Sequence, residues 1–192
     1  MKTLLLTGGS SGIGLHTVQL FAEKGWTVFE LSRSGKSNQD VTHIDCDVTD
    51  DVSVKQAISE VMQRIDHLDV VINNAGFGIS GPIEYTSTTE AQKQFDVNFF
   101  GAFRLTKAVL PILRKQGRGR IIFTSSVAAD LSIPYQSFYS ASKSALNAMA
   151  LALANEVREF GIRVSVLMPG DVATGFTDSR EKNIHGAEVY KG

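Results

Sequence analysis

Short apolar segments alternate with longer amphipathic ones along the whole chain, and this alternation constrains the fold more than any other feature of the sequence. The short segments have the length of strands and cover residues 4–7, 27–31, 42–45, 68–73, 120–124 and 163–167. Residues 4–7 and 68–73 contain continuous apolar runs, which are typical of strands buried on both faces of a parallel sheet. The segments between them place apolar side chains at helical spacing, over residues 13–24, 51–65, 88–116 and 139–160. The sequence therefore predicts an α/β fold in which helices cover both faces of a doubly wound parallel sheet, in three layers.

Length, charge and cysteine content narrow the class of protein. A chain of 192 residues buries one sizeable core, so we expect residues 1–192 to form a single domain. The 19 basic and 20 acidic residues give a net charge of -1, which argues against a nucleic-acid or membrane partner. No apolar segment approaches the roughly 20 residues of a membrane span. Cys46 is the only cysteine and favours a reducing compartment, so we expect a cytoplasmic protein.

Several residues of reactive or aromatic type are not predicted to form a site. Cys46 has no partner base in any motif, and we expect it to be a small buried residue. Four aromatic residues within 88–116 are expected to pack in the core or against another subunit: Phe95, Phe99, Phe100 and Phe103. The histidines lack the spacing of metal ligands: His16, His43, His67 and His185. We therefore predict no metal site.

A glycine-rich segment, Thr7-Gly8-Gly9-Ser10-Ser11-Gly12-Ile13-Gly14, joins the first strand to the first helix. Glycine lets the backbone approach a pyrophosphate, and the free N–H groups at the start of a helix bind anions. A tight turn without a ligand is the alternative. The position between a strand and a helix favours a nucleotide site, although the spacing Gly-x-x-x-Gly-x-Gly differs from the common Gly-x-Gly-x-x-Gly fingerprint.

Tyr139 and Lys143 lie four residues apart at the start of a segment without proline or glycine. Residues with this spacing share one face of a helix, so the phenol and the ammonium can point to the same place. A cation in a poorly hydrated site favours the phenolate, which suits a general acid or base near neutral pH. The alternative for the pair alone is an exposed aromatic residue beside a solvated lysine.

These motifs together resemble the short-chain dehydrogenase/reductase family over essentially the whole chain. The resemblance implies a Rossmann-like sheet with strand order 3-2-1-4-5-6 and a dinucleotide cofactor. Asn73-Asn74-Ala75-Gly76 follows the fourth strand as the family motif does, and Asp47-Val48 resembles the pair that contacts adenine. Pro169-Gly170 resembles the start of the turn that holds the nicotinamide amide. The cofactor-binding residues implied are Gly8, Ser10, Ser11, Gly12, Ile13, Gly14, Ser32, Arg33, Asp47, Val48, Asn74, Ala75, Gly76, Tyr139, Lys143, Pro169, Gly170, Val172 and Thr174.

The same resemblance implies a catalytic tetrad of Asn98, Ser126, Tyr139 and Lys143. Tyr139 would exchange a proton with the substrate oxygen, and Lys143 would activate it and hold the nicotinamide ribose. Ser126 would donate a hydrogen bond to the substrate oxygen, with its neighbour Ser125 as the alternative. Asn98 would close a proton relay through its backbone carbonyl and a water. Its alternative role is to satisfy a bend in the helix near Gly101.

Cofactor preference depends on the end of the second strand. Ser32 and Arg33 offer a hydroxyl and a guanidinium to a 2'-phosphate, which favours NADP over NAD. Two observations oppose this. Glu30 lies on the same strand face as Ser32 and could bind the ribose hydroxyls instead. Ser11 also stands where many NADP-preferring relatives carry a basic residue. Arg33 could alternatively be a solvated loop charge.

The C-terminal end departs from the family pattern. Relatives continue past the Pro-Gly turn to a seventh strand, whereas residues 177–191 contain no clear strand, so we expect a chain that is truncated relative to the family, with an unusually short member as the alternative. The sixth strand would then be an exposed edge. The substrate site is expected between residues 77–83, 127–134 and 176 onward. Its mixed apolar lining does not identify the substrate.

The sequence thus predicts an oxidoreductase that interconverts a small-molecule carbonyl and an alcohol. A catalytically idle NADP-binding sensor or scaffold of the same fold is the alternative, and epimerisation or dehydration on this scaffold is a third possibility. Small residues on the 139–160 helix permit close helix packing. The family resemblance implies a homodimer or homotetramer that pairs through the 88–116 and 139–160 helices.

Overall fold

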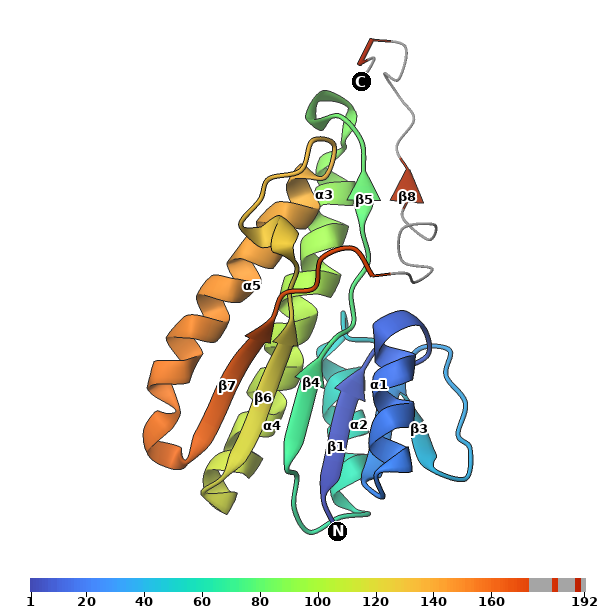
Figure 1. Ribbon diagram of the computed structural model, residues 1–192, viewed down its shortest axis with the longest axis vertical. Coiled ribbons are helices and arrows are strands. Elements are labelled where there is room, and N and C mark those ends of the chain that lie inside the picture. The colour runs from blue at the N-terminus through green and yellow to red at the C-terminus, as the bar shows by residue number, and fades with distance from the viewer. Residues whose placement is uncertain (173–180, 183–188, 191–192) are drawn as a thin grey trace.

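The computed structural model describes residues 1–172, 181–182 and 189–190. A six-stranded parallel sheet forms the centre of the molecule, in the order β3-β2-β1-β4-β6-β7 (Figure 1). Its strands are β1 (Thr3–Thr7), β2 (Thr27–Ser32), β3 (Val41–Asp45), β4 (Val70–Asn73), β6 (Gly119–Thr124) and β7 (Ile162–Leu167). The chain builds outward from β1 in both directions, and the predicted order 3-2-1-4-5-6 is confirmed.

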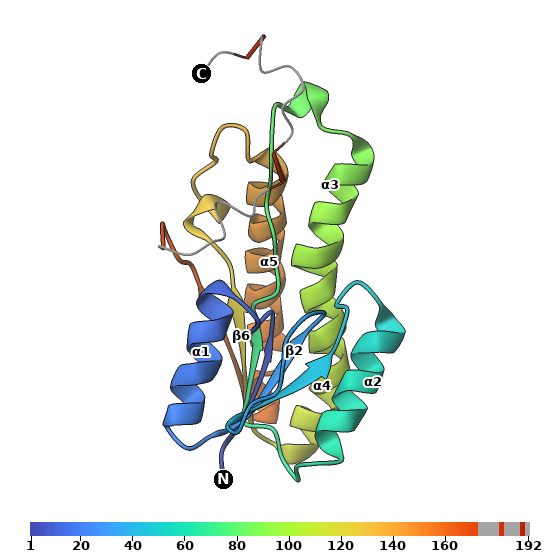
Figure 2. The same ribbon diagram turned by 90° about the vertical axis from the view of Figure 1, so that its right-hand side faces the viewer.

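Helices cover the two faces of the sheet unequally (Figure 2). One face is packed by α1 (Gly12–Glu23), and the other by α2 (Asp51–Met62), α4 (Ala102–Gln116) and α5 (Ser137–Glu156). Successive side chains of β1 point to opposite faces, so Leu5 joins the larger core while Leu4 and Leu6 join the α1 core. This burial on both sides explains why β1 is a continuous apolar segment.

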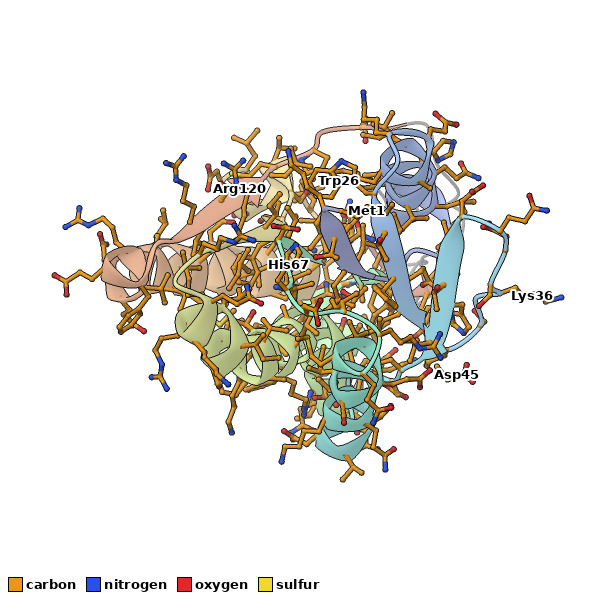
Figure 3. All side chains as sticks on the ribbon, turned by 90° about the horizontal axis from the view of Figure 1, so that it is seen from below. Met1, Trp26, Lys36, Asp45, His67 and Arg120 are labelled. Carbon is orange, nitrogen blue, oxygen red and sulfur yellow. The ribbon has the colours of Figure 1, made fainter. Side chains whose placement is uncertain are left out.

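The last strand, β7, has one uncovered face. Ile162 is buried, but Arg163, Ser165 and Leu167 on alternate positions are exposed. Figure 3 shows the Arg120 side chain of β6 on the same side of the sheet as α1. Within the described residues, α1 is the helix on that side, and it lies over the β1 and β2 half of the sheet. Within the described residues β7 pairs with β6 alone and is the edge strand of the sheet, as the sequence predicts.

The single helix expected over residues 88–116 is wrong in one respect. The structure has α3 (Thr88–Phe95), then a π-helical segment η2 (Asp96–Gly101), then α4. A capping box between Ser87 and Glu90 begins α3. A Cβ on Gly101 would lie 2.8 Å from Val48 Cγ2, so the absence of a side chain there lets the helix approach the end of β3. Such π segments widen one turn and are frequent at functional sites.

Two short strands were not predicted. β5 (Ile79–Ser80) pairs in parallel with β8 (Glu181–Lys182), which corrects the expectation that residues 177–191 contain no strand. The Lys93 ammonium lies 2.6 Å from a Glu181 carboxylate oxygen and reinforces this contact from α3. Three 3-10 turns complete the described elements: η1 (Ile83–Tyr85), η3 (Val127–Ala129) and η4 (Arg158–Phe160). None of the described helices is long and apolar enough to cross a membrane.

Candidate active site and cofactor site

The polar segments singled out in the sequence follow β1, β2, β3, β4, β6 and β7, and parallel strands all end at the same edge of the sheet (Figure 1). The strand order reverses between β1 and β4, the two adjacent strands at the centre of the sheet. In open α/β sheets the ligand site lies outside the strand ends at this reversal. The glycine-rich segment after β1 and the Asn73-Asn74 segment after β4 meet at this point.

Two glycines of the first segment are needed for close backbone contacts. Gly8 has φ +72°, and a Cβ there would lie 2.8 Å from Ala75 Cα. A Cβ on Gly14 would overlap the Gly8 carbonyl oxygen. The backbone after β1 is therefore pressed against both the start of α1 and the segment after β4. No other residue type fits at these two positions.

The N-terminus of α1 is open to a ligand. Its N-cap, Ser11, makes no side-chain cap hydrogen bond, and the first turn carries no acidic residue. Ser10 and Ser11 are both exposed. The first N–H groups of a helix are without intrahelical partners, and the helix dipole favours an anion there. This end of α1 is suited to a phosphate group.

Asn74 and Thr7 join the two segments. The Asn74 side-chain amide donates to the carbonyl oxygens of Thr7 at 3.2 Å and Gly8 at 3.0 Å. The Thr7 hydroxyl oxygen accepts from the backbone N–H groups of Asn74 and Ala75 at 3.1 and 3.2 Å. These hydrogen bonds fix Ala75 and Gly76 beside the glycine-rich segment.

The Glu30 carboxylate is bonded to Gly9 and His43 and not to groups beyond the end of β2. The side chain is buried, and one carboxylate oxygen accepts from the Gly9 N–H at 2.9 Å while the other lies 2.6 Å from His43 Nδ1. Because a carboxylate only accepts, His43 Nδ1 donates in this contact. Glu30 therefore holds the glycine-rich segment from below. Arg33, which follows β2, is exposed.

Asp47 and Val48 lie at the end of β3. The Asp47 carboxylate accepts from the backbone N–H and the hydroxyl of Thr49, at 2.9 and 2.7 Å. Burial acts to raise the pKa of Asp47, but these hydrogen bonds and the nearby Arg33 and Arg104 outweigh it and hold the pKa below 3.8. Val48 is buried. The Arg33 guanidinium and an ionised Asp47 thus flank the same edge of the sheet.

Tyr139 and Lys143 lie one turn apart on α5 and are both buried, with 7% and 4% of their surfaces exposed. The Lys143 ammonium is 5.8 Å from the Tyr139 ring centroid and donates to the Thr124 carbonyl oxygen at 2.7 Å. Burial lowers the pKa of Lys143 from 10.5 to about 8. The structure therefore brings these two side chains together at the end of β6, away from water.

The two serines after β6 have different surroundings. The Ser125 side chain is buried and its hydroxyl donates to the Lys143 carbonyl oxygen at 3.3 Å. Ser126 is half-buried, and its hydroxyl oxygen accepts from the Ala128 N–H at 3.1 Å. This bond uses the oxygen of Ser126 and leaves its hydrogen able to donate. Of the two, Ser126 is the one with a hydroxyl suited to a substrate oxygen.

Asn98 belongs to the π-helical segment and is buried. Its side-chain amide bonds the backbone of Phe77 in both directions, with Oδ1 accepting and Nδ2 donating at 3.0 Å each. Nδ2 also lies 3.2 Å from the Ser142 hydroxyl oxygen. A Cβ on Gly76 would lie 3.2 Å from Asn98 Oδ1 and 3.6 Å from Lys143 Nζ. Asn98 and Lys143 therefore converge on Gly76.

The last residue of β7 and the residues after it close the site from the other side. The Leu167 carbonyl accepts from the Ser125 N–H at 2.8 Å, and the Pro169 carbonyl accepts from the Val127 N–H at 3.0 Å. Gly170 and Val172 follow and are exposed. Thr174 and the expected wall from residue 176 onward lie outside the described residues, apart from 181–182 and 189–190.

Comparison with known proteins decides the family. A family model described as short chain dehydrogenase matches residues 2–185. The chain belongs to the short-chain dehydrogenase family. It is 46% identical over 180 residues to 3-ketodihydrosphingosine reductase of Bacteroides thetaiotaomicron, over 93% of this chain and 67% of that protein. Family membership and this named reductase support an oxidoreductase activity.

Solved structures agree with this assignment. The crystal structure of a short-chain dehydrogenase from Streptomyces avermitilis matches with a TM-score of 0.88 at 33% identity, over 95% of this chain and 70% of that one. The structure of ElxO with NADP bound matches with a TM-score of 0.87 at 25% identity, over 99% and 80%. Both neighbours share the Rossmann-like sheet of this short-chain dehydrogenase.

Sequence reasoning missed the roles of three residues that shape the site of this short-chain dehydrogenase, because it considered Glu30 only as a ribose ligand and His43 only as a metal ligand. Glu30 and His43 are direct partners in the register of β2 and β3, and Gln94 is fully buried on α3. A charged residue inside an apolar strand is a signal that could have pointed to Glu30, because a buried charge needs a partner. No comparable signal marks Gln94, which lies among exposed polar residues in the sequence.

Two expectations about reactive residues can be compared with the structure. Cys46 is buried, as expected, and burial raises the pKa of its thiol from 9.0 to about 11, which leaves it poorly nucleophilic. Phe100 and Phe103 are exposed on η2 and α4, while Phe95 and Phe99 are half-buried. The aromatic cluster therefore contributes as much to the surface as to the core.

Proposed function

We propose that this protein is an NADP(H)-preferring oxidoreductase that interconverts a carbonyl compound and its alcohol, with Tyr139 as general acid and base. The observation that carries the proposal is the burial of the Lys143 ammonium 5.8 Å from the Tyr139 ring. A desolvated cation favours the phenolate over the phenol. A protein that only binds a dinucleotide has no need of this pair. The family supports an oxidoreductase activity, and the proposal adds Tyr139 as the residue that carries the proton.

The residues at the strand ends fit a nicotinamide dinucleotide. The uncapped N-terminus of α1 suits the pyrophosphate, and Gly8 and Gly14 leave no side chain in its way. On the adenosine side we assign Ser32, Arg33, Asp47, Val48 and Asn74, and on the nicotinamide side Pro169, Gly170, Val172 and Thr174. When bound, the nicotinamide supplies or accepts the hydride.

Proton transfer is assigned to this chain's own side chains. Reduction adds a hydride to the carbonyl carbon and a proton to the carbonyl oxygen, and the Tyr139 hydroxyl gives that proton. The Ser126 hydroxyl donates to the same oxygen as its negative charge grows. The Tyr139 phenolate that remains is stabilised by the Lys143 ammonium and regains its proton through it. Oxidation of an alcohol runs the same steps in reverse.

Asn98 is assigned to this relay through its backbone carbonyl and not through its side chain. Its amide is fully engaged with Phe77 and Ser142, so the side chain is not available to a substrate. Asn98 lies within the π-helical segment η2, and π segments are frequent at functional sites, which supports a role for the Asn98 backbone carbonyl with a bridging water.

The preference for NADP is supported by charge at the end of β2. With Glu30 engaged by Gly9 and His43, the exposed cation at this position is Arg33. Among the described residues, the buried Ser32 hydroxyl oxygen has no hydrogen-bond partner. A guanidinium and a free hydroxyl are the groups that a 2'-phosphate would use. ElxO is solved with NADP bound and the Brucella melitensis 3-ketoacyl-(acyl-carrier-protein) reductase is complexed with NADH, so the preference for NADP rests on the residues at the end of β2.

The substrate class follows from the walls of the site that are described. Leu131 and Ile133 on one side and Ile83 on the other are exposed apolar side chains. The Gly81 N–H donates to the Tyr135 carbonyl oxygen at 2.8 Å, so the two walls are joined at their outer ends. An apolar ketone fits this lining, and the Bacteroides relative is named for such a substrate, 3-ketodihydrosphingosine.

The test is a reductase assay followed at the nicotinamide absorbance. The purified protein is given NADPH or NADH with 3-ketodihydrosphingosine and a panel of aliphatic and aromatic ketones. We expect turnover with at least one ketone, faster with NADPH. In Tyr139→Phe we expect turnover to fall by about 1,000-fold or more, since the proton donor is lost, while NADPH binds with unchanged affinity. Full activity in Tyr139→Phe would exclude the mechanism.

A catalytically idle NADP-binding sensor is the second candidate. It requires the glycine-rich segment and the open end of α1, but neither Lys143 in a buried site nor a free Ser126 hydrogen. If NADPH binds and no ketone or alcohol is turned over by the wild-type protein, this second function replaces the first.

Subunit pairing is proposed through the helices expected from the sequence. Phe100 and Phe103 of the 88–116 region and Leu151 of α5 are exposed, at 45%, 42% and 66%. Apolar side chains of this size on neighbouring helices suit a contact between two copies across a two-fold axis. Sedimentation of the wild type and of Phe103→Lys tests this, and a dimer or tetramer that dissociates in the variant is the expected result.

A further inference from the structure

Gln94 is a buried polar residue that the proposed mechanism does not use. It lies near the end of α3, four residues before Asn98, and its exposed fraction is 0%. Few glutamines are fully buried, because each carries two donor hydrogens and an acceptor that need partners. Its neighbours Gln92 and Lys93 on the same helix are exposed. Its burial therefore requires an explanation from its contacts.

Both ends of the Gln94 amide bond the segment that follows Gly76. Oε1 accepts from the Ile79 N–H at 2.7 Å, and Nε2 donates to the Phe77 carbonyl oxygen at 2.6 Å. Asn98, one turn further on, bonds the Phe77 N–H and the same carbonyl at 3.0 Å. The two amides thus take the place of a neighbouring strand and pair three backbone groups over residues 77–79.

This segment connects the catalytic residues to the outer wall of the substrate site. At its start, Gly76 lies against Asn98 and Lys143. At its end, Ile79 pairs with Glu181 in the small β5-β8 sheet. Asn98 in turn contacts the Ser142 hydroxyl, which donates to the Tyr139 carbonyl oxygen at 2.8 Å. A displacement of residues 77–79 would therefore reach both α5 and the wall.

We propose that Gln94 is a positioning residue for catalysis, which holds residues 77–79 in register with Asn98 and thereby fixes the wall against which the substrate carbonyl is placed. The effect on catalysis rests on the proposed function. The two hydrogen bonds from Gln94 to residues 77–79, which we call the clamp, do not depend on it. Gln94 touches neither the cofactor-binding end of α1 nor Arg33. Its loss should change the use of substrate and leave cofactor affinity intact.

Two substitutions test the clamp. Gln94→Leu has a similar volume and makes no hydrogen bond, which leaves the Ile79 N–H and one bond to Phe77 unpaired. Gln94→Glu keeps the shape, but its ionised form presents an acceptor to the Phe77 carbonyl oxygen and repels it. Its protonated form restores one donor and one acceptor. Gln92→Leu and Gln92→Glu, on the exposed face of the same helix, are the matched controls.

Amide hydrogen exchange reads the clamp without any turnover. We expect the Ile79 amide to exchange about tenfold faster or more in Gln94→Leu than in the wild type, while the Gln92→Leu control matches the wild type. Amides of β1 serve as an internal reference for global stability. An Ile79 amide equally protected in wild type and Gln94→Leu would overturn the proposal.

Steady-state kinetics reads the consequence. With the best ketone of the reductase assay, we expect kcat/KM of Gln94→Glu at pH 8 to fall by about 10- to 100-fold, with the NADPH dissociation constant within about twofold of wild type. Relative to wild type, activity should recover as the pH is lowered to 6, because protonation of the new carboxyl group restores the donor to Phe77. Gln92→Glu should show no such recovery.

Each outcome separates this inference from the proposed function. A folded Gln94→Glu whose pH profile runs parallel to wild type, with unchanged kcat/KM, would overturn the positioning role. A wild-type protein without turnover would overturn the proposed function, and hydrogen exchange at Ile79 would still decide whether Gln94 holds the segment. If Gln94→Leu does not fold, Gln94→Glu compared at pH 6 and pH 8 carries both measurements.

Discussion

The Lys143 ammonium donates a hydrogen bond of 2.7 Å to the backbone carbonyl of Thr124, at the end of β6. This contact holds the cation beside Tyr139, so removal of the amine should affect chemistry more than cofactor binding at the pyrophosphate. We expect Lys143→Met to lower kcat by about 100-fold or more, because the phenolate loses its stabilising charge. Assays across pH 6 to 10 would show whether raising the pH partly restores the phenolate. A variant with wild-type kcat would contradict the role assigned to Lys143.

The same burial predicts a pH dependence of stability. Unfolded Lys143 binds its proton below pH 10.5, whereas folded Lys143 does so only below about 8, so the unfolded state holds more protons between these values. The free energy of unfolding of wild type, relative to Lys143→Met, should therefore fall by about 3 kcal/mol as the pH drops from 10.5 to 8. Urea unfolding of both proteins at several pH values measures it. A difference that does not vary with pH would mean that Lys143 is hydrated.

Ser126 and Ser125 can be separated by substitution. Ser126→Ala removes the hydroxyl hydrogen available to a substrate oxygen, and we expect kcat to fall by about 100- to 1,000-fold with stability nearly unchanged. Ser125→Ala removes the bond to the Lys143 carbonyl, so we expect a loss of about 1 kcal/mol of stability and a smaller kinetic effect. Kinetics and thermal unfolding of both variants make the comparison. The opposite ranking in kcat would assign the catalytic hydroxyl to Ser125.

The sheet could be predicted from the sequence because its central strands, β1 and β4, are buried on both faces and therefore stand out as apolar segments. Leu4, Leu5 and Leu6 illustrate this, since all three are fully buried although they point to opposite sides. The positions of the motif residues followed from the strand ends. The order of the strands came from the family pattern, which the structure confirms.

The break in the 88–116 helix could not be predicted in the same way. Apolar spacing continues through residues 96–101, and the change from α to π geometry shifts the hydrogen-bond pattern by one residue without a change in composition. The pairing of Glu30 with His43 depends on the register of β2 against β3, and the partners of Gln94 depend on the path of residues 77–79. These are tertiary relationships, which local periodicity does not record.

His43 and Glu30 predict a second pH effect, of opposite sign to that of Lys143. Burial acts to lower the pKa of His43, but its hydrogen bonds to Glu30 and Asp45 outweigh this and raise the pKa above 6.5. The folded state then holds the proton more tightly, so the stabilisation is complete below pH 6.5 and is lost as the pH rises through the folded pKa. We expect the stability difference between wild type and His43→Gln to be larger at pH 6 than at pH 9. The comparison repeated in Glu30→Gln should show a smaller change, and an equal change there would exclude the pairing as its cause.

Arg33 is the residue on which cofactor preference depends, and the loop that carries it offers a control. Arg33 and Lys36 are both exposed cations of the segment between β2 and β3, and Lys36 projects outward at the edge of the sheet (Figure 3). Asp45, at the end of β3, lies on the same side of the molecule as Lys36 (Figure 3). Loss of either cation changes the net charge of this region by the same amount, so Lys36→Ala controls for the loss of Arg33. In Arg33→Ala we expect the NADPH dissociation constant to rise by about 10- to 100-fold, because a charge-assisted bond to the 2'-phosphate is lost, with NADH affinity unchanged. Lys36→Ala should change the dissociation constant of neither cofactor by more than about twofold, as expected for a screened surface charge. Titration of intrinsic tryptophan fluorescence with each cofactor measures these constants. If Arg33→Ala loses NADPH and NADH affinity equally, the guanidinium binds a phosphate that both cofactors share. If Lys36→Ala loses as much NADPH affinity as Arg33→Ala, the effect comes from the net charge of the loop and not from a specific bond.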